Sequence, residues 1–351
     1  MNADVTRAVI QRALDEQAFP AAVVEVGTSS DILWREAFGR LTFEIGAPET
    51  RDDTIFDLAS LTKVMATTPL IMQQVERGPF GLDDAVARHI ARWRGADREG
   101  VTLRDLLAHC GGLTAYLPFF RDHRGRAEFE HAICALPLEY PPRTKSVYSD
   151  LGFMLLAFIL EDAGTAPLAD RFATLLDQMD IVERLQFNPP PQWRRDTAPT
   201  EIDPWRGRLL VGEVHDENAF ALGGAAGHAG LFGTAAAVGA YARHLLQVLD
   251  GRTGAFSRDT LAAFIARRAD IPGSSRALGW DTMLPSSSCG TRMSPRAFGH
   301  TGFTGTSLWI DPDRGIYVVL LTNRVHPTRT NERIKHVRPA VHDAVLESLA
   351  R

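Results

Sequence analysis

Apolar positions recur every three or four residues across 4–17, near the start of the chain, and this spacing predicts an amphipathic helix. Two extended runs of largely apolar residues follow, at 21–27 and 32–38. The polar residues 28–31 join these two runs, an arrangement that indicates a β-hairpin. The chain is therefore expected to begin with one helix and two antiparallel strands.

Helical spacing dominates the middle of the chain, between turns that are rich in glycine and proline. The Pro-rich segment 188–204 has no clear period and is expected to be irregular. The predicted helices span 68–77, 83–93, 103–109, 128–135, 151–163 and 235–249.

Strand patterns return toward the end of the sequence, at 278–283, 298–310 and 316–322, the last of which is strongly apolar. A final helical pattern runs to Leu349, and Pro339 either kinks this helix or marks its start. Strands at both ends of the chain and helices between them predict an α+β fold.

This arrangement predicts one antiparallel sheet that is formed from both chain termini and flanked by helices, over 1–62 and 266–351. Residues 63–265 are expected to form a large, mostly helical lobe inserted into it. We expect the two lobes to make one catalytic unit, because a cleft between lobes is the usual place for a small-molecule site.

One short stretch offers candidate chemistry. The extended apolar run 55–58 changes to helical spacing at Ser60, so this serine is expected at an exposed turn where a helix begins. Lys63 lies three residues later and shares a helix face with Ser60. A buried lysine with a lowered pKa is able to activate a serine hydroxyl as a nucleophile. A helix N-cap serine beside a solvated lysine is the structural alternative.

The charge of the chain argues against several classes of partner. Its net charge of −5 at pH 7 gives no general attraction to nucleic acid or to an anionic membrane surface. The longest apolar run, 151–160, is too short to cross a bilayer. The first residues lack the apolar core of a secretory signal, so a cytoplasmic location is expected.

The three cysteines, Cys110, Cys134 and Cys289, have neither CxxC nor Cys/His spacing. We therefore expect no disulfide framework and no zinc site, and interpret the three thiols as small buried apolar groups.

Two further motifs support a catalytic role for Ser60. Tyr148-Ser149-Asp150 precedes an apolar helical run, and His300-Thr301-Gly302 lies in a strand-like segment. In the order Ser-x-x-Lys, Tyr-x-Asp and His-Thr-Gly, the chain resembles the penicillin-interactive serine enzymes. The tyrosine in the second motif is similar to that of class C β-lactamases, serine DD-peptidases, nearby D-aminopeptidases and related esterases.

The resemblance extends over about residues 5–349. The segment 101–113 looks like the helix and turn that follow the nucleophile in this family, and 223–235 is similar to its later glycine-rich loop. The glycine-rich run lacks the spacing of either nucleotide-phosphate motif, so phosphate binding is not expected.

The resemblance implies a role for each matching residue. Ser60 attacks a carbonyl carbon and becomes acylated, while Lys63 and Tyr148 take up its proton and pass it to the leaving group. The backbone N–H groups of Ser60 and Phe303 form the oxyanion hole, and Asp150 belongs to the substrate-binding part of the site. Taken singly, Tyr148 is better explained as a core tyrosine with a satisfied hydroxyl; only the three motifs together in this order favour the catalytic role.

The substrate-binding residues implied by the resemblance also include His300, Thr301 and Gly302. Asp150 stands where many relatives carry asparagine, and a carboxylate near Lys63 favours the charged ammonium. Asp150 therefore points away, is protonated or recognises a cationic or hydrogen-bond-donating group. His300 replaces a lysine of many relatives, although alone it is better explained as a strand histidine on a polar face.

Together, the changes at Asp150 and His300 lower the positive charge available to hold a substrate carboxylate, and this argues against efficient β-lactam hydrolysis. His215 and His228 resemble a signature of one hydrolase subgroup, and we interpret them as possible cleft-wall residues. A structural loop is the main alternative for both histidines, and without a His-Glu-x-x-His pattern no metal is expected.

The sequence therefore predicts a cofactor-free serine hydrolase that forms an acyl-enzyme at Ser60 and cleaves a small ester or an amide or peptide. A carboxylesterase and a D-amino-acid peptidase both fit this prediction. The alternatives are a penicillin-binding DD-carboxypeptidase or β-lactamase, and a binding protein that has kept the fold without turnover, for which Asp150 beside Lys63 is the motive. The oligomeric state stays open.

Overall fold

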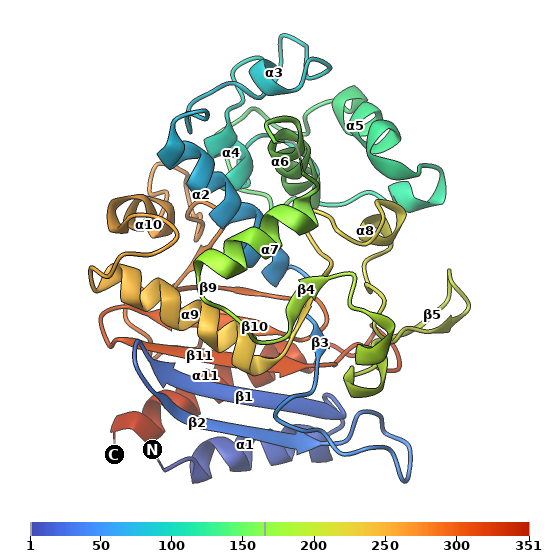
Figure 1. Cartoon of the computed structure of the whole chain (residues 1–351), viewed down its shortest axis with the longest axis vertical. Helices are drawn as coiled ribbons and strands as arrows, with labels where there is room; N and C mark the ends of the chain where they lie inside the picture. The colour runs from blue at the N-terminus through green and yellow to red at the C-terminus, as the bar shows by residue number, and fades with distance from the viewer. Residues whose placement is uncertain (1, 165, 351) are drawn as a thin grey trace.

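The computed structural model describes residues 2–164 and 166–350 of the chain. Two lobes are visible in Figure 1: a sheet lobe that contains both chain ends, and a helical lobe above it. Met1, Thr165 and Arg351, which the predicted lobes include, lie outside the described residues. The division of the chain at 62/63 and 265/266 stays a prediction.

The sheet lobe is built on one six-stranded antiparallel sheet in the order β2-β1-β11-β10-β9-β8. Its first strand pairs with its last in sequence, from Ala22 opposite Thr322 to Thr28 opposite Ile316. The prediction of an α+β fold with a sheet from both termini is confirmed. The strands are β1 (Ala21–Thr28), β2 (Ile32–Gly39), β8 (Asp281–Thr282), β9 (Phe298–Thr301), β10 (Ser307–Asp311) and β11 (Ile316–Thr322).

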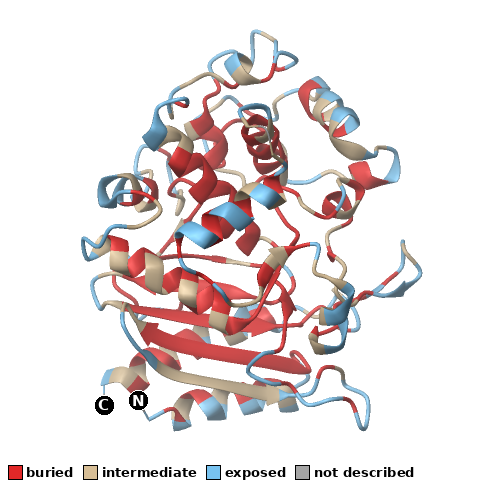
Figure 2. Ribbon diagram, in the orientation of Figure 1, coloured by how far each residue is buried: buried red, intermediate tan, exposed pale blue. Residues whose placement is uncertain are grey.

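Helices cover both faces of the sheet, which explains why β11 is buried along its whole length. Alternate side chains of a strand point to opposite faces. Val319 packs into the core shared with α9 (Ala235–Leu249), and Val318 packs into the core shared with α1 (Asp4–Asp15) and α11 (Ile334–Ala350). Figure 2 shows the buried central strands between these helices.

The helical lobe surrounds α6, whose residues 151–160 are all buried. Short two- and three-residue strands, β3, β7 and β4, form a second sheet beside it. The remaining elements are β3 (Phe56–Asp57), a π-helical turn (Lys63–Thr67), α2 (Thr68–Arg77), α3 (Val86–His89), α4 (Leu103–Leu107), α5 (Gly125–Ala135), α6 (Asp150–Asp162), α7 (Leu168–Gln178), β4 (Leu185–Phe187), β5 (Ile202–Asp203), β6 (Arg208–Leu209), α8 (Glu217–Ala221), β7 (Leu231–Gly233) and α10 (Arg258–Ile265), with 3-10 turns at Phe119–Arg121 and Pro191–Asp196.

Three predicted elements differ in the structure. The helix expected at 83–93 shrinks to α3, because the backbone is extended at both of its ends while the apolar side chains still reach the core. The run 298–310 divides into β9 and β10, with a turn at Gly305, whose φ is +117°. Pro339 lies inside α11 and does not mark its start.

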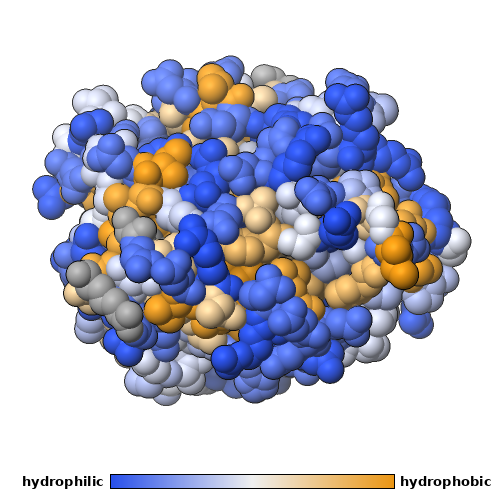
Figure 3. Space-filling model, turned by 90° about the horizontal axis from the view of Figure 1, so that it is seen from below, coloured by the Kyte–Doolittle hydropathy of each residue, from blue (hydrophilic) through white to orange (hydrophobic). Residues whose placement is uncertain are grey.

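The outer surface is mainly polar. Seen from below, apolar side chains lie in small groups separated by polar and charged ones (Figure 3). Within the described ranges, no helix has the length and apolar character needed to cross a membrane. All three cysteines are buried and free, as expected.

Candidate active site

The predicted site residues meet in a cavity of about 560 Å³ between the two lobes. Ser60, Tyr148 and Asp150 reach it from the helical side. The sheet lobe contributes the end of β9 and the turn after it, so that the structure brings together residues far apart in the sequence. This second group comprises His300, Thr301, Gly302 and Phe303.

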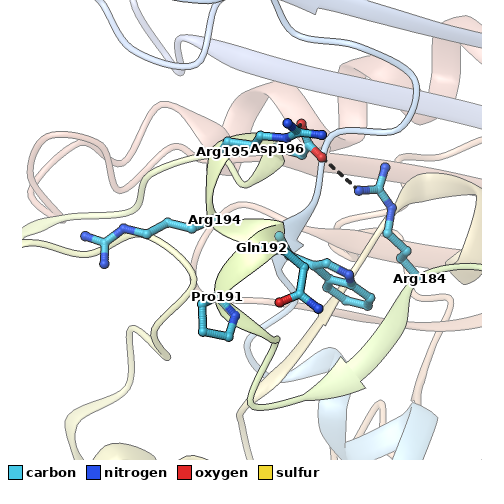
Figure 4. A pocket seen from close by; sticks show the side chains of 7 residues that line it. Arg184, Pro191, Gln192, Arg194, Arg195 and Asp196 are labelled. Carbon is cyan, nitrogen blue, oxygen red and sulfur yellow. Dashed lines mark hydrogen bonds and ion pairs between the residues drawn. The ribbon is translucent and has the colours of Figure 1, made fainter.

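A second hollow, of about 720 Å³, lies on the surface around the 3-10 turn Pro191–Asp196 (Figure 4). Its Arg184 is bound to Asp196 at 3.1 Å. Its lining residues include neither a nucleophile nor any of the predicted site residues. The cavity at Ser60 is therefore the candidate active site.

Ser60 sits on a tight turn between β3 and the π-helical turn Lys63–Thr67. The preceding residue, Ala59, has a φ of +47°, which is strained for a residue with a side chain, and its N–H donates to Asp57 Oδ1 at 2.8 Å. Strain of this kind is tolerated where the surrounding structure holds it in place. The turn presents the Ser60 hydroxyl to the cavity.

Gly302 supports this turn from the sheet side. A Cβ on this residue would lie 2.5 Å from the Leu58 carbonyl oxygen and 3.3 Å from the Ala59 side chain. The neighbouring Thr304 and Thr306 hydroxyls donate to the Asp57 and Leu58 carbonyls at 2.7 and 3.0 Å. The glycine of the His-Thr-Gly motif thus permits close packing of β9 against the Ser60 turn.

Lys63 is fully buried behind Ser60. Its Nζ lies 3.0 Å from Ser60 Oγ, 3.0 Å from the His228 carbonyl oxygen and 2.7 Å from Asp150 Oδ1. Burial alone lowers the pKa of Lys63, but Asp150 and then Tyr148 outweigh burial and raise the pKa above its ordinary value. Asp150 therefore points toward Lys63, and Lys63 is a charged ammonium at neutral pH.

Tyr148 covers the other side of Lys63, with its ring centre 4.8 Å from Nζ. Its hydroxyl oxygen is shielded from solvent and has no hydrogen-bond partner among the described residues. Burial raises the pKa of Tyr148, against the opposing effect of Lys63. The resting site thus contains a neutral phenol next to an ammonium.

His109 holds the Tyr148 segment and was missed by the sequence reasoning. Its Nδ1 accepts a hydrogen bond from the Ser149 N–H at 3.0 Å, and its ring centre lies 4.6 Å from that of Tyr148. Burial and the nearby Arg276 lower the pKa of His109 well below the ordinary value. The only available signal was its place in the segment 101–113.

His300 lines the cavity as an uncharged imidazole. Its Nδ1 lies 2.9 Å from the Thr301 carbonyl oxygen, which only accepts, so Nδ1 carries the proton and Nε2 is a free lone pair. Nε2 has no partner among the described residues. Burial lowers the pKa of His300 well below its usual value, with further contributions from Arg276 and Lys63. His300 therefore supplies no charge for a substrate carboxylate.

Arg276 corrects the expectation that the site is poor in positive charge. It lines the cavity, and its guanidinium carbon lies 5.1 Å from the Tyr148 ring centre. No carboxylate of the described chain lies within ion-pair distance of it, so its charge is available to a ligand. It stands outside every recognised motif, and sequence alone gave no reason to select it.

The two cleft-wall histidines have different positions. His215 lines the cavity, stacks on the Phe303 ring at 5.7 Å and contacts Glu201 Oε2 at 2.9 Å. His228 lies behind the cavity wall, where its ring contacts Asp216 Oδ1 at 2.9 Å. Its carbonyl holds Lys63. No group of three or more His, Cys, Asp and Glu residues suitable for a metal occurs in the described ranges.

The predicted oxyanion donors are compatible with their role. Among the described residues, the backbone N–H groups of Ser60 and Phe303 have no acceptor. The Gly302 carbonyl, which belongs to the same peptide as the Phe303 N–H, accepts a hydrogen bond from Arg338 Nη2 at 2.5 Å, which fixes the orientation of this peptide. Two free N–H groups are thus available at the cavity for a developing oxyanion.

Comparison with known proteins identifies the family. Residues 6–342 match the family model described as Beta-lactamase. A protein of Escherichia coli strain K12 named "Putative D-alanyl-D-alanine carboxypeptidase" is 30% identical, with 88% of this chain and 79% of that protein covered. A protein of the same name from Salmonella gallinarum is also 30% identical, with coverages of 80% and 72%.

Solved structures agree with this assignment at the level of the fold. A penicillin-binding protein homologue from Pyrococcus abyssi has a TM-score of 0.78 and 18% identity, over 100% of this chain and 78% of that one. The hydrolase EstCE1 has a TM-score of 0.75 and 21% identity over 97% and 98%. A class C β-lactamase has a TM-score of 0.76 and 16% identity over 97% and 95%. The chain therefore belongs to the β-lactamase family and is a serine hydrolase.

Proposed function

We propose that the protein cleaves a small ester or an amide or peptide through an acyl-enzyme at Ser60. The observation that carries this proposal is the 3.0 Å contact between Ser60 Oγ and Lys63 Nζ at the wall of the cavity between the lobes. The strained turn at Ala59 exposes the hydroxyl, and the packing of β9 fixes it in place.

In the proposed reaction, Ser60 Oγ attacks the substrate carbonyl carbon, and the carbonyl oxygen becomes an oxyanion between the N–H groups of Ser60 and Phe303. The tetrahedral intermediate collapses with loss of an alcohol or amine. Water then attacks the acyl-enzyme by the same route and releases the acid. Removal of one oxyanion donor in such a site typically costs about 10²- to 10³-fold in rate.

A carboxypeptidase is the second candidate, and Arg276 is the observation that favours it. A guanidinium without a carboxylate partner, at the His300 end of the cavity, is suited to the free carboxylate of a peptide. The names of the curated relatives agree with this activity. The substrate of this candidate is a short peptide with a free C-terminus.

The test is intact-mass spectrometry after incubation with a fluorophosphonate, a penicillin and a p-nitrophenyl ester, together with release of p-nitrophenol. We expect phosphonate labelling and ester turnover, both lost in Ser60→Ala. A penicillin adduct on Ser60 would favour the carboxypeptidase candidate. Absence of adducts and of turnover would overturn the proposal and leave a binding protein on the same fold.

A further inference from the structure

The contacts of Lys63 restrict how it is able to take up the Ser60 proton. Three oxygen atoms surround Nζ at 2.7 to 3.0 Å, those of Ser60, His228 and Asp150. An ammonium has three hydrogens and no lone pair; it donates hydrogen bonds to Ser60 Oγ and to the His228 carbonyl, while Asp150 Oδ1 is its ion-pair partner. In this state Lys63 is unable to accept the Ser60 proton unless it releases one of its own.

The other groups near Ser60 offer no better acceptor. Tyr148 is a neutral phenol with a raised pKa. His300 has a free Nε2 lone pair, but no hydrogen bond joins His300 to Ser60 or Lys63 among the described residues. The carboxylate of Asp150 is the basic group in direct contact with Lys63, and its side chain is 16% exposed to the cavity.

We propose that Asp150 is the terminal proton acceptor of the acylation step and that Lys63 relays the proton to it. The proposal rests on the function proposed for Ser60. One Nζ proton first passes to Asp150 Oδ1, which leaves Lys63 as a neutral amine with a lone pair. As the bond between Ser60 Oγ and the carbonyl carbon forms, this lone pair takes up the hydroxyl proton. The carbonyl π electrons move to the oxyanion, and Lys63 is again an ammonium.

The proton taken up by Asp150 is returned when the leaving group departs. When the intermediate collapses, the bond to the leaving group breaks, Lys63 protonates the leaving amine or alkoxide, and Asp150 then gives its proton back to the neutral Lys63 amine. The carboxylate and the ammonium are regenerated, with no net proton taken from solvent. Deacylation repeats the sequence with water in place of the Ser60 hydroxyl. In this scheme, Asp150 has a catalytic role that an asparagine is unable to supply.

Asp150→Asn separates this proposal from a simple counter-ion role, because the two predict changes of opposite sign. If Asp150 only holds Lys63 protonated, the amide frees Lys63 to lose a proton, and the rate stays equal or rises. If Asp150 accepts the proton, the rate falls by about 100-fold or more, the usual contribution of a general base. The loss is expected to be larger for a peptide than for a p-nitrophenyl ester, whose leaving group needs no proton.

The experiment measures kcat and kcat/KM from pH 4 to 10 for the wild type, Asp150→Asn, Asp150→Glu and Asp162→Asn. Asp162 is an exposed carboxylate at the other end of α6 and serves as the control with unchanged activity. Other titratable groups face Asp150, namely Lys63, Tyr148 and Tyr116, and Asp216 lines the same cavity. Because each of them is able to affect a pH profile, the profiles are compared between variants. We expect Asp150→Glu to restore part of the activity that Asp150→Asn loses.

Thermal unfolding and fluorophosphonate labelling accompany each variant, which distinguishes lost chemistry from lost folding. An Asp150→Asn variant that is folded but within threefold of wild-type activity, or faster, would overturn the relay while leaving the Ser60 nucleophile intact. A wild type that no phosphonate labels would remove the proposed function and the relay together. If Asp150→Asn does not fold, the wild-type rate is measured in mixtures of H2O and D2O. A curved plot of rate against deuterium fraction supports the transfer of two protons in the acylation step, and a linear plot opposes the relay.

Discussion

At the scale of single residues, the charge state of the site differs from the simplest picture of a serine activated by a neutral lysine. Lys63 is charged because Asp150 lies 2.7 Å from its Nζ, while His300 is neutral because it is buried near Arg276. The position that bears a cation in many relatives therefore holds a hydrogen-bond acceptor. Arg276 supplies a positive charge at the cavity that no carboxylate of the described residues pairs with.

Arg276→Gln should therefore impair reaction with substrates that carry a free carboxylate more than reaction with neutral substrates. A charge-assisted hydrogen bond typically contributes about 1.5 to 3 kcal/mol, so we expect KM for a peptide with a free C-terminal carboxylate to rise by about 10- to 100-fold. Turnover of a neutral ester should change little. Steady-state kinetics on a peptide and its C-terminal amide measures the difference.

Arg276→Lys is the matched variant, because it retains the charge and loses the planar donor geometry, and it should fall between wild type and Arg276→Gln. An equal loss on the peptide and on its amide would contradict a carboxylate-binding role for Arg276.

Sequence reasoning reached the residues that lie in motifs and not those that act through packing. Ser60 and Lys63 were found because three-residue spacing on a helix brings two side chains together. His109 contacts the Tyr148 segment across a separation of about 40 residues, and Arg276 faces the cavity from an irregular segment near β8. Only the tertiary fold makes these contacts.

At the scale of elements, the end of β9 and the Ser60 turn act as one unit. Gly302, Thr304 and Thr306 all contact residues 57–59, so the strand that borders the cavity also holds the nucleophile. The motif was predicted to bind substrate. The structure adds a packing reason for its glycine, which any larger side chain would disturb.

Gly302→Ala should displace the Ser60 turn. The added Cβ would meet the Leu58 carbonyl at 2.5 Å, and the backbone is unable to yield without moving Ala59. We expect kcat/KM to fall by about 100-fold, as is typical when a small misplacement disturbs a reacting group. Ester hydrolysis and the melting temperature report activity and stability.

Gly100→Ala is the control for Gly302→Ala, since a Cβ at Gly100 meets nothing within 4 Å. Wild-type activity in Gly302→Ala would show that the turn does not depend on this contact.

Helix prediction from periodicity succeeded for some helices and failed for others of similar length. The predicted spans of α2 and α9 match the structure, while α7 was missed although Leu168, Phe172 and Leu175 have helical spacing and are buried. The region 83–93 has the same kind of spacing, but its extended residues leave only α3 helical. Periodicity indicates which side chains are buried more reliably than it indicates backbone conformation.

At the scale of the whole molecule, a charged network joins the two sides of the cavity. Glu201 accepts hydrogen bonds from His215 and from the Arg329 guanidinium at 2.9 and 2.6 Å, and Arg329 also binds Glu217 at 2.8 Å. Burial raises the pKa of Glu201, but the bonds from His215 and Arg329 outweigh it and lower the pKa to about 2.

Because the pKa of Glu201 is lowered in the folded protein, the free energy of unfolding depends on pH in the acidic range. Because the unfolded carboxyl titrates near about 4.3, Glu201 contributes stability that is complete above that pH and is lost as the pH falls toward about 2. Glu201→Gln should thus be less stable than the wild type at pH 7, and the difference should shrink steadily between these two values. Urea unfolding at a series of pH values measures this difference.

Glu99→Gln, at an exposed carboxylate, is the control and should follow the wild type. A pH-independent difference between Glu201→Gln and the wild type would contradict this account of the network.

The pairing of β1 with β11 also has a consequence for biosynthesis. The first hairpin leaves the ribosome early, but the strand that completes its pairing emerges only after the whole helical lobe has been synthesised. Until then the nascent chain carries an open strand edge, which is prone to association with other chains. The turn that orients Ser60 lacks its support from Gly302 and Thr306 over the same interval. Hydrolytic activity is therefore expected only after β11 has been synthesised and has paired with β1.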